Sequence, residues 1–260
     1  MKVFLLCALA LLLCMGLGTA IVFFLLRKKR DRAGKLLLSA LLGLLLLGAA
    51  GFGYLSVYYH AAPEAAAFLV SDASVSVSET GKGLFFDGPG CEAALIFYPG
   101  AKVEESAYAP LLRELAQGGL DCFLVRMPLR MAVLDMDAAE QLRAEYDYRT
   151  WLLAGHSLGG AVAANLLSAG SGGYDALVLL ASYPTRPLPE DLRLLSVYGS
   201  EDGCLDREAY EAGRAFWPAE TRELLLSGGI APAMRPAVRG GRRCPPLLPM
   251  HSKTGSPRRS

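Results

Sequence analysis

The sequence of 260 residues contains only three histidines, His60, His156 and His251. It contains no CxxC pair and no cysteine or histidine spacing typical of a metal site, so no metal is expected, and none of its motifs implies an organic cofactor. The formal net charge is +1, and the basic residues lie mainly near the N-terminus and in the C-terminal tail. The folded part therefore lacks the basic stripe of a nucleic-acid-binding protein.

The six cysteines form no disulfide framework. Cys7 and Cys14 fall in an apolar run, whereas Cys91 and Cys122 each open a predicted strand. Two buried free thiols are the favoured interpretation of Cys91 and Cys122, and a disulfide between them is the alternative.

Two long apolar runs stand at the N-terminus, from Val3 to Leu26 and from Leu36 to Tyr59. Each is long enough to cross a hydrocarbon core of about 30 Å. The basic segment 27–35 between them should stay in the cytoplasm, which predicts an extracellular domain after Tyr59 on a cell-membrane protein. A cleaved signal peptide is the alternative for the first run, but its basic start is only Lys2 and its small residues are followed by more apolar sequence. Residues 1–60 are thus predicted to be two transmembrane helices.

Residues 61–229 alternate between predicted strands and helices, which indicates an α/β domain with a mainly parallel sheet and flanking helices. A β-hairpin is predicted first, over residues 75–87, because apolar and polar residues alternate around a GKG turn. Buried strands are then expected at 93–100, 121–128, 150–155, 175–182, 192–200 and 221–229, with helices at 105–119, 137–146, 160–170 and 207–216. Only about ten residues separate the 175–182 and 192–200 strands, which is too few for a cap domain.

The composition changes at residue 230. Residues 230–260 contain seven basic residues, six prolines and no acidic residue. Such a segment buries too little apolar surface to offset the entropy of ordering it, so we predict that it is disordered.

Residues 155–159 read Gly-His-Ser-Leu-Gly, the pattern of a nucleophile elbow. The apolar strand TWLLAG leads in and the small-residue helix GAVAANLL leads out, as this motif requires. Ser157 is therefore the candidate nucleophile, and Gly155, His156 and Gly159 complete the turn.

The backbone N–H of Leu158 is the first candidate oxyanion donor, and Gly100 or Ala101 after the FYPG strand supplies the second. The acid should follow a later strand, where LLSVYGSEDG places Asp202. Glu201 and Asp206 are the alternatives.

GHSLGG, the FYPGAK strand end and YGSEDG, in this order, resemble the α/β-hydrolase superfamily, and most of all its small, membrane-anchored bacterial members of the dienelactone-hydrolase-like type. The resemblance spans residues 65–229 and implies a histidine after the last strand, commonly as Gly-Gly-Asn-His. Here Gly228 and Gly229 are present, but Ile230 and Ala231 stand where the asparagine and histidine belong.

The triad base is therefore missing from its expected place. His156 lies in the elbow, His60 lies before the domain, and His251 in the tail is only a remote candidate base. Since an out-of-frame reading of a GC-rich gene would create such a tail, we hypothesise a frameshift at Gly229 that also removed a closing helix.

The resemblance implies a serine hydrolase that acts on a small acyl or ester substrate through an acyl-enzyme, impaired by the loss of its base. An inactive binding protein at the membrane surface and an acyltransferase are the alternatives. The sequence does not fix the oligomeric state.

Overall fold

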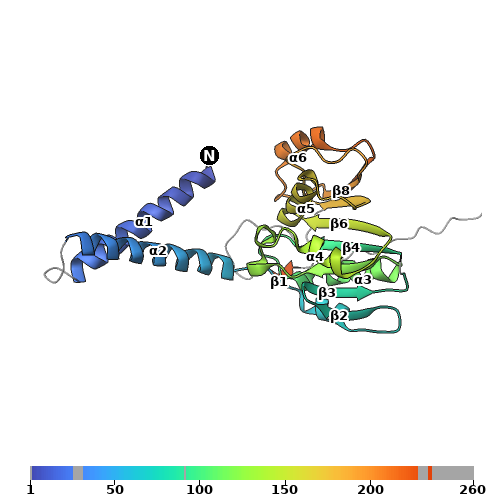
Figure 1. The fold of residues 1–260 in the computed structure, drawn as a ribbon, viewed down its shortest axis with the longest axis horizontal. Coiled ribbons are helices and arrows are strands. Elements are labelled where there is room, and N and C mark those ends of the chain that lie inside the picture. The colour runs from blue at the N-terminus through green and yellow to red at the C-terminus, as the bar shows by residue number, and fades with distance from the viewer. Residues whose placement is uncertain (1, 26–31, 91, 228–233, 236–260) are drawn as a thin grey trace, which may run out of the picture. The chain divides into compact units, whose positions relative to one another are not determined.

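The computed structural model describes residues 2–25, 32–90, 92–227 and 234–235. The chain divides into two compact units, residues 1–57 and 58–260 (Figure 1).

The first unit consists of two helices, α1 (Lys2–Leu25) and α2 (Arg32–Ser56). The helices pack closely, since a Cβ at Gly18 would lie 2.8 Å from the backbone nitrogen of Gly43. Within the described residues, one segment, Ala33–Ser56, is long and apolar enough to cross a membrane, by length and composition alone. The apolar stretch described in α1, Leu12–Phe24, is shorter. The prediction of two membrane spans is therefore not confirmed.

The second unit is built on an eight-stranded sheet with the order β2-β3-β5-β4-β6-β7-β8-β9. β3 pairs antiparallel with both β2 and β5, and every pair from β5–β4 to β8–β9 is parallel. The predicted α/β class with a mainly parallel sheet is confirmed. The strands are β2 (Ser76–Thr80), β3 (Gly83–Asp87), β4 (Ala93–Tyr98), β5 (Asp121–Val125), β6 (Thr150–His156), β7 (Ala176–Leu180), β8 (Arg193–Gly199) and β9 (Thr221–Leu226).

Helices cover both faces of this sheet (Figure 1). One face packs against α3 (Ala109–Gln117), and the other against α4 (Ala138–Glu145), α5 (Leu158–Ser168) and α6 (Arg207–Gly213). All five residues of β5 are buried, as expected for a central strand covered on both faces. The short 3-10 helices are η1 (Pro63–Leu69), η2 (Glu105–Tyr108), η3 (Pro128–Arg130), η4 (Ala132–Leu134) and η5 (Arg214–Phe216).

The connection from β7 to β8, residues 181–192, contains neither a helix nor a strand. No cap domain is therefore inserted at this point of the described chain. This connection therefore places no domain over the carboxyl edge of the sheet, where the elbow lies.

The sheet is less well covered at its β9 end. Leu224 pairs in register with Val197 and, through it, with Leu180, so the three side chains share the face covered elsewhere by α3. Leu224 is 48% exposed and Leu225, on the opposite face, is 54% exposed. In the described residues no helix covers Leu224, which is the surface that a closing helix would bury.

A second, two-stranded sheet corrects two predictions. His60–Ala61 (β1) pairs antiparallel with Met234–Arg235 (β10). His60 therefore belongs to the second unit rather than preceding it, and part of the tail forms a strand. The remaining residues of the tail lie outside the described part of the chain.

Cys122 is a free, buried thiol, so it forms no disulfide with Cys91. Burial, followed by the nearby charge of Asp121, raises the pKa of the Cys122 thiol. Cys91 itself lies outside the described residues. Cys204 is disulfide-bonded, which the sequence analysis did not predict.

Candidate active site

Ser157 lies in the sharp turn between β6 and α5. Its backbone has φ 51° and ψ −122°, a conformation that L-residues rarely adopt and that is maintained only where the surroundings enforce it. The Ser157 residue is exposed although both its neighbours are at least partly buried. The turn therefore presents the serine hydroxyl to solvent at the carboxyl edge of the sheet.

The flanking glycines are required by space. A Cβ at Gly155 would lie 2.5 Å from the backbone of Gly159 and Gly160, and a Cβ at Gly159 would overlap the carbonyl oxygens of Tyr98 and Pro99. Neither residue has a positive φ, so close approach of backbone, and not glycine's conformational freedom, accounts for them.

The end of β7 fixes the backbone of the serine. The Ser157 N–H donates to the Leu180 carbonyl at 2.9 Å, and the buried Ser182 hydroxyl donates to the Ser157 carbonyl at 2.8 Å. Ser182 also fills the space beside Gly160, where a Cβ would meet its side chain. The strained turn is thus held from the neighbouring strand as well as from its own helix.

Two backbone donors lie beside the serine. Leu158 is the first residue of α5, so its N–H is one of those that the helix leaves unpaired. The loop after β4 lies alongside, because Tyr98 of β4 is in register with Gly155 of β6. Of its two candidate donors, Gly100 N–H donates to the Tyr108 hydroxyl at 2.9 Å, whereas the Ala101 N–H has no partner among the described residues. The geometry therefore favours Ala101 over Gly100.

Tyr108 connects this loop to His156. Its hydroxyl lies 2.9 Å from His156 Nδ1, and burial raises the pKa of the phenol. Because the hydroxyl already accepts from Gly100, it can donate to Nδ1, which makes that nitrogen an acceptor. The His156 imidazole thus packs on Gly100 and Tyr108, and it supports the loop that carries Ala101.

Asp202 lies in the turn after β8. Its Oδ1 accepts hydrogen bonds from the backbone N–H groups of Cys204, at 2.9 Å, and Leu205, at 3.1 Å. The carboxylate is half-buried, and its Oδ2 accepts no hydrogen bond from the described residues. Of the alternatives, Glu201 is exposed, and the Asp206 carboxylate caps α6 by accepting from the Ala209 N–H. Asp202 is therefore oriented by two backbone donors, whereas Asp206 accepts one as the cap of α6.

Within the described part of the chain, no histidine side chain is hydrogen-bonded to the Ser157 hydroxyl. The Ser157 hydroxyl has no hydrogen-bond partner among the described residues, while Ile230, Ala231 and His251 lie outside them. His60 lies in β1, and its Nδ1 is 3.1 Å from Glu104 Oε2. The sequence analysis missed this pair because Glu104 lies 44 residues further along the chain.

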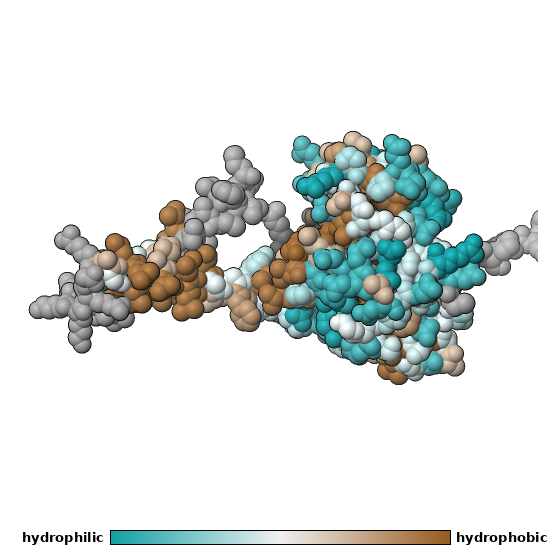
Figure 2. Space-filling model, in the orientation of Figure 1, coloured by the Kyte–Doolittle hydropathy of each residue, from teal (hydrophilic) through white to brown (hydrophobic). Residues whose placement is uncertain are grey.

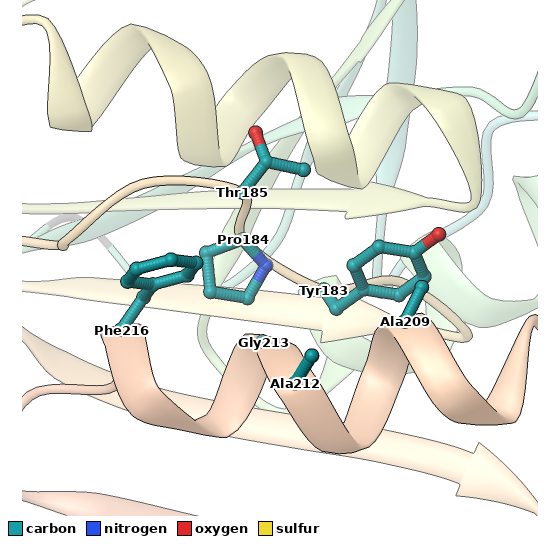
Figure 3. Close-up of a pocket in the computed structure, with 7 residues that line it drawn as sticks. All are labelled: Tyr183, Pro184, Thr185, Ala209, Ala212, Gly213 and Phe216. Carbon is teal, nitrogen blue, oxygen red and sulfur yellow. The ribbon is translucent and has the colours of Figure 1, made fainter.

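A small apolar hollow lies between α6 and the start of the β7–β8 connection (Figure 3). Tyr183 and Pro184 lie on one side of it, and Ala212, Gly213 and Phe216 lie on the other. Tyr183 directly follows Ser182, which bonds the Ser157 carbonyl. Tyr183 is thus one residue from a direct contact with the nucleophile turn, and the hollow is lined mainly by carbon.

Among solved structures, TT1662 from Thermus thermophilus has 18% sequence identity, with 60% of this chain and 90% of that chain covered and a TM-score of 0.46. MGS-M1, an alpha/beta hydrolase enzyme from a Medee basin deep-sea metagenome library, has 16% identity, with 61% and 84% covered and a TM-score of 0.45. Carboxylesterase CesB (YbfK) from Bacillus subtilis has 10% identity, with 64% and 87% covered and a TM-score of 0.45. A comparison with curated protein sequences finds no match.

A family model described as "Alpha/beta hydrolase family" matches residues 94–233, which is more than half of the chain. The matched range contains the elbow, the strand end before Ala101 and the turn of Asp202. The chain therefore belongs to the alpha/beta hydrolase family.

Proposed function

We propose that this chain is a serine hydrolase of the dienelactone-hydrolase-like type that acts on an ester or related acyl substrate and is impaired by the absence of its histidine. The observation that carries the proposal is the exposed Ser157 in a strained backbone conformation at the start of α5. Strain of this kind persists only where the surrounding structure imposes it, and it concentrates at functional sites. Here the hydrogen bond from Ser182 and the close packing at Gly155 and Gly159 impose it.

In this mechanism the Ser157 Oγ forms a bond to the acyl carbon while its proton passes to a base. The carbonyl oxygen becomes an oxyanion that the N–H groups of Leu158 and Ala101 stabilise, and the alcohol leaves with the proton. Water then attacks the acyl-enzyme. The base takes a proton from this water and returns it to the Ser157 Oγ as the carboxylic acid leaves. Asp202 would orient the histidine, so without that histidine the carboxylate has nothing to orient and the serine is a weak nucleophile near neutral pH.

We also infer that α2 anchors the chain in the cell membrane, with the second unit outside. The apolar segment Ala33–Ser56 supports the anchor, and the basic segment 27–35 supports the orientation. Protease treatment of intact cells tests the orientation, because an extracellular second unit is degraded and a cytoplasmic one is protected.

Hydrolysis of p-nitrophenyl acetate and butyrate tests the catalytic proposal. The full chain in detergent is compared with Ser157→Ala and with the double variant Ile230→Asn/Ala231→His, which places a histidine where the family resemblance requires one. We expect the double variant to gain activity of the order of 10³-fold or more that Ser157→Ala then removes. A folded double variant with no gain would refute the proposed place of the base.

An inactive binding protein is the second candidate function. The observation that favours it is that the Ser157 hydroxyl has no hydrogen-bond partner among the described residues. The apolar hollow at Tyr183 and Phe216 would then hold an acyl group without cleaving it. Equal rates for the full chain and its Ser157→Ala variant, together with retained binding of a non-hydrolysable ester analogue, would support this candidate.

A further inference from the structure

Exposed apolar side chains are concentrated in the connection between β5 and α4. In the second unit nine large apolar residues are exposed among those described, and four of them lie between residues 129 and 136. They are Leu129, Val133, Leu134 and Met136, with 47%, 45%, 54% and 41% of their surfaces exposed. Such a concentration of exposed apolar side chains commonly marks an interaction site.

The connection is held in place by its other residues. The Tyr98 hydroxyl donates to the Met136 carbonyl at 2.6 Å and accepts from the Ala139 N–H at 2.9 Å. The Asp135 carboxylate is paired with Lys82 at 2.8 Å, and Ala132 is buried. The backbone is therefore fixed while the four apolar side chains project outward.

Leu129 also has a positive φ of 48°, which costs free energy for a bulky residue. The neighbouring Arg130 has a φ of 58°. Leu129 is exposed in spite of this cost, so burial of its side chain within the unit does not offset the strain. Burial of the Leu129 side chain against an external apolar partner would offset the strain.

The segment lies at the same edge of the sheet as the candidate site. It follows the carboxyl end of β5, which is parallel to β4 and, through β4, to β6, and η4 packs against α5. Residues 132–134 thus lie beside the helix that begins at Leu158. The apolar cluster and Ser157 face the same side of the second unit.

The chain from α2 joins the second unit at this edge as well. Tyr59 N–H donates to the Lys102 carbonyl at 2.7 Å, and the Lys102 N–H donates to the Arg130 carbonyl at 2.9 Å. The Arg130 guanidinium lies 3.4 Å from the centre of the Tyr58 ring. Since α2 ends at Ser56, only Val57 and Tyr58 separate the apolar helix from the first hydrogen bond to this edge.

We propose that Leu129, Val133, Leu134 and Met136, together with Tyr59, form a surface that docks into the lipid interface of the membrane in which α2 anchors the chain. The inference rests on the proposed membrane anchor. Apolar side chains flanked by tyrosine and arginine are the chemistry that inserts at the headgroup boundary. Apolar patches interrupt the otherwise mainly hydrophilic surface of the second unit, whereas the helices of the first unit are largely apolar (Figure 2).

Docking of this surface turns the Ser157 edge toward the lipid. The substrate class that reaches this site most readily is then an ester that resides in the membrane, with its acyl chain in the bilayer and its carbonyl at the interface. A short-chain ester dissolved in water would have no such advantage.

Fluorescence quenching by brominated phosphatidylcholine tests the docking surface. The full chain is reconstituted in vesicles with bromines near the headgroups, and the tryptophan substitution Leu134→Trp is compared with the matched substitution Glu190→Trp. Glu190 is exposed before β8, at the amino edge of the same sheet. The parent chain, with Trp151 and Trp217, supplies the background.

We expect Leu134→Trp to lose most of its added fluorescence in brominated vesicles and to emit at shorter wavelength, and Glu190→Trp to do neither. Leu129→Trp serves in the same way if Leu134→Trp does not fold. Equal quenching of the two positions in chains that float with the vesicles would overturn the docking surface. Failure of the parent chain to float would instead refute the anchor on which the inference rests.

Discussion

The part of the site formed by β4, β6 and β7 is more complete than the part formed by the chain after β8 and β9. In the first part the serine backbone is bonded from Leu180 and Ser182, and the donors at Leu158 and Ala101 stand alongside. In the second part Asp202 is oriented, but in the described chain no base reaches the serine and Leu224 is left exposed.

This difference shows which parts of the site depend on a single segment of the chain and which depend on several strands of the sheet. The elbow is maintained by contacts from three neighbouring strands, so it persists whatever follows β9. Under the proposed function, the base and the cover over Leu224 would both come from residues after Gly229. A change at one point of the chain would then remove catalysis without removing the fold.

The largest expected effect concerns Asp202. In the double variant Ile230→Asn/Ala231→His, Asp202→Asn should lower the rate of ester hydrolysis about 10³- to 10⁴-fold, because the carboxylate orients the histidine. In the chain as it stands the same substitution should change nothing. Glu201→Gln and Asp206→Asn are matched controls, and a comparable loss in either would move the acid away from Asp202.

Truncation of the sheet core compares its centre with its β9 end. Leu177→Ala, at a fully buried position of β7, should lower the free energy of unfolding by about 2–5 kcal/mol. Leu225→Ala, at an exposed position of β9, should change it by less than about 0.5 kcal/mol. Urea unfolding, monitored by the fluorescence of Trp151 and Trp217, measures the free energy of unfolding of both variants. Similar losses of stability would show that the β9 end is as well packed as the centre.

The packing of the elbow is tested by a single methyl group. Gly159→Ala should lower the free energy of unfolding by about 1–3 kcal/mol, because the Cβ overlaps the carbonyl oxygens of Tyr98 and Pro99. Gly172→Ala is the control, since nothing lies within 4 Å of a Cβ at that position. Equal stability of the two variants would mean that the turn is looser than described.

The smallest effect concerns Glu104, which joins the segment after α2 to the second unit. Burial opposes its ionisation, but hydrogen bonds from Ser106, the Ala61 N–H and His60 outweigh burial and lower the pKa of the carboxyl. A lowered folded pKa means that this stabilisation is present above the unfolded pKa, about 4.3, and is lost as the pH falls through the folded value. The Tm difference between the parent and Glu104→Gln should shrink at low pH. A difference that grows would contradict the lowered pKa of Glu104.

The sequence predicted the strands and helices of the second unit well because their signals are local. Residues 93–98 and 122–125 are continuous apolar runs that become buried parallel strands, and GHSLGG stands between an apolar strand and a small-residue helix, where it predicts the turn. The choice between Gly100 and Ala101 could not be made in this way. It depends on the Tyr108 hydroxyl, which accepts from Gly100 and has no signature in the sequence.

The prediction that His60 precedes the folded domain was wrong for a related reason. It was based on the apolar run before His60, whereas the contacts that place His60 come from Glu104 and from Met234–Arg235. Pairing of segments so distant in sequence leaves no periodicity to read. The exposed cluster at Leu129 to Met136 was also missed, because apolar residues in a connection resemble a buried loop until their exposure is known.

Labelling by a fluorophosphonate probe tests the central claim most directly, since the probe reports whether Ser157 is activated and mass spectrometry locates the adduct. The account predicts that Ser157 of the folded chain labels on the order of 10³-fold more slowly than Ser157 of the Ile230→Asn/Ala231→His variant. Equally rapid labelling of Ser157 in the two chains would contradict it, because a base would then already serve the serine.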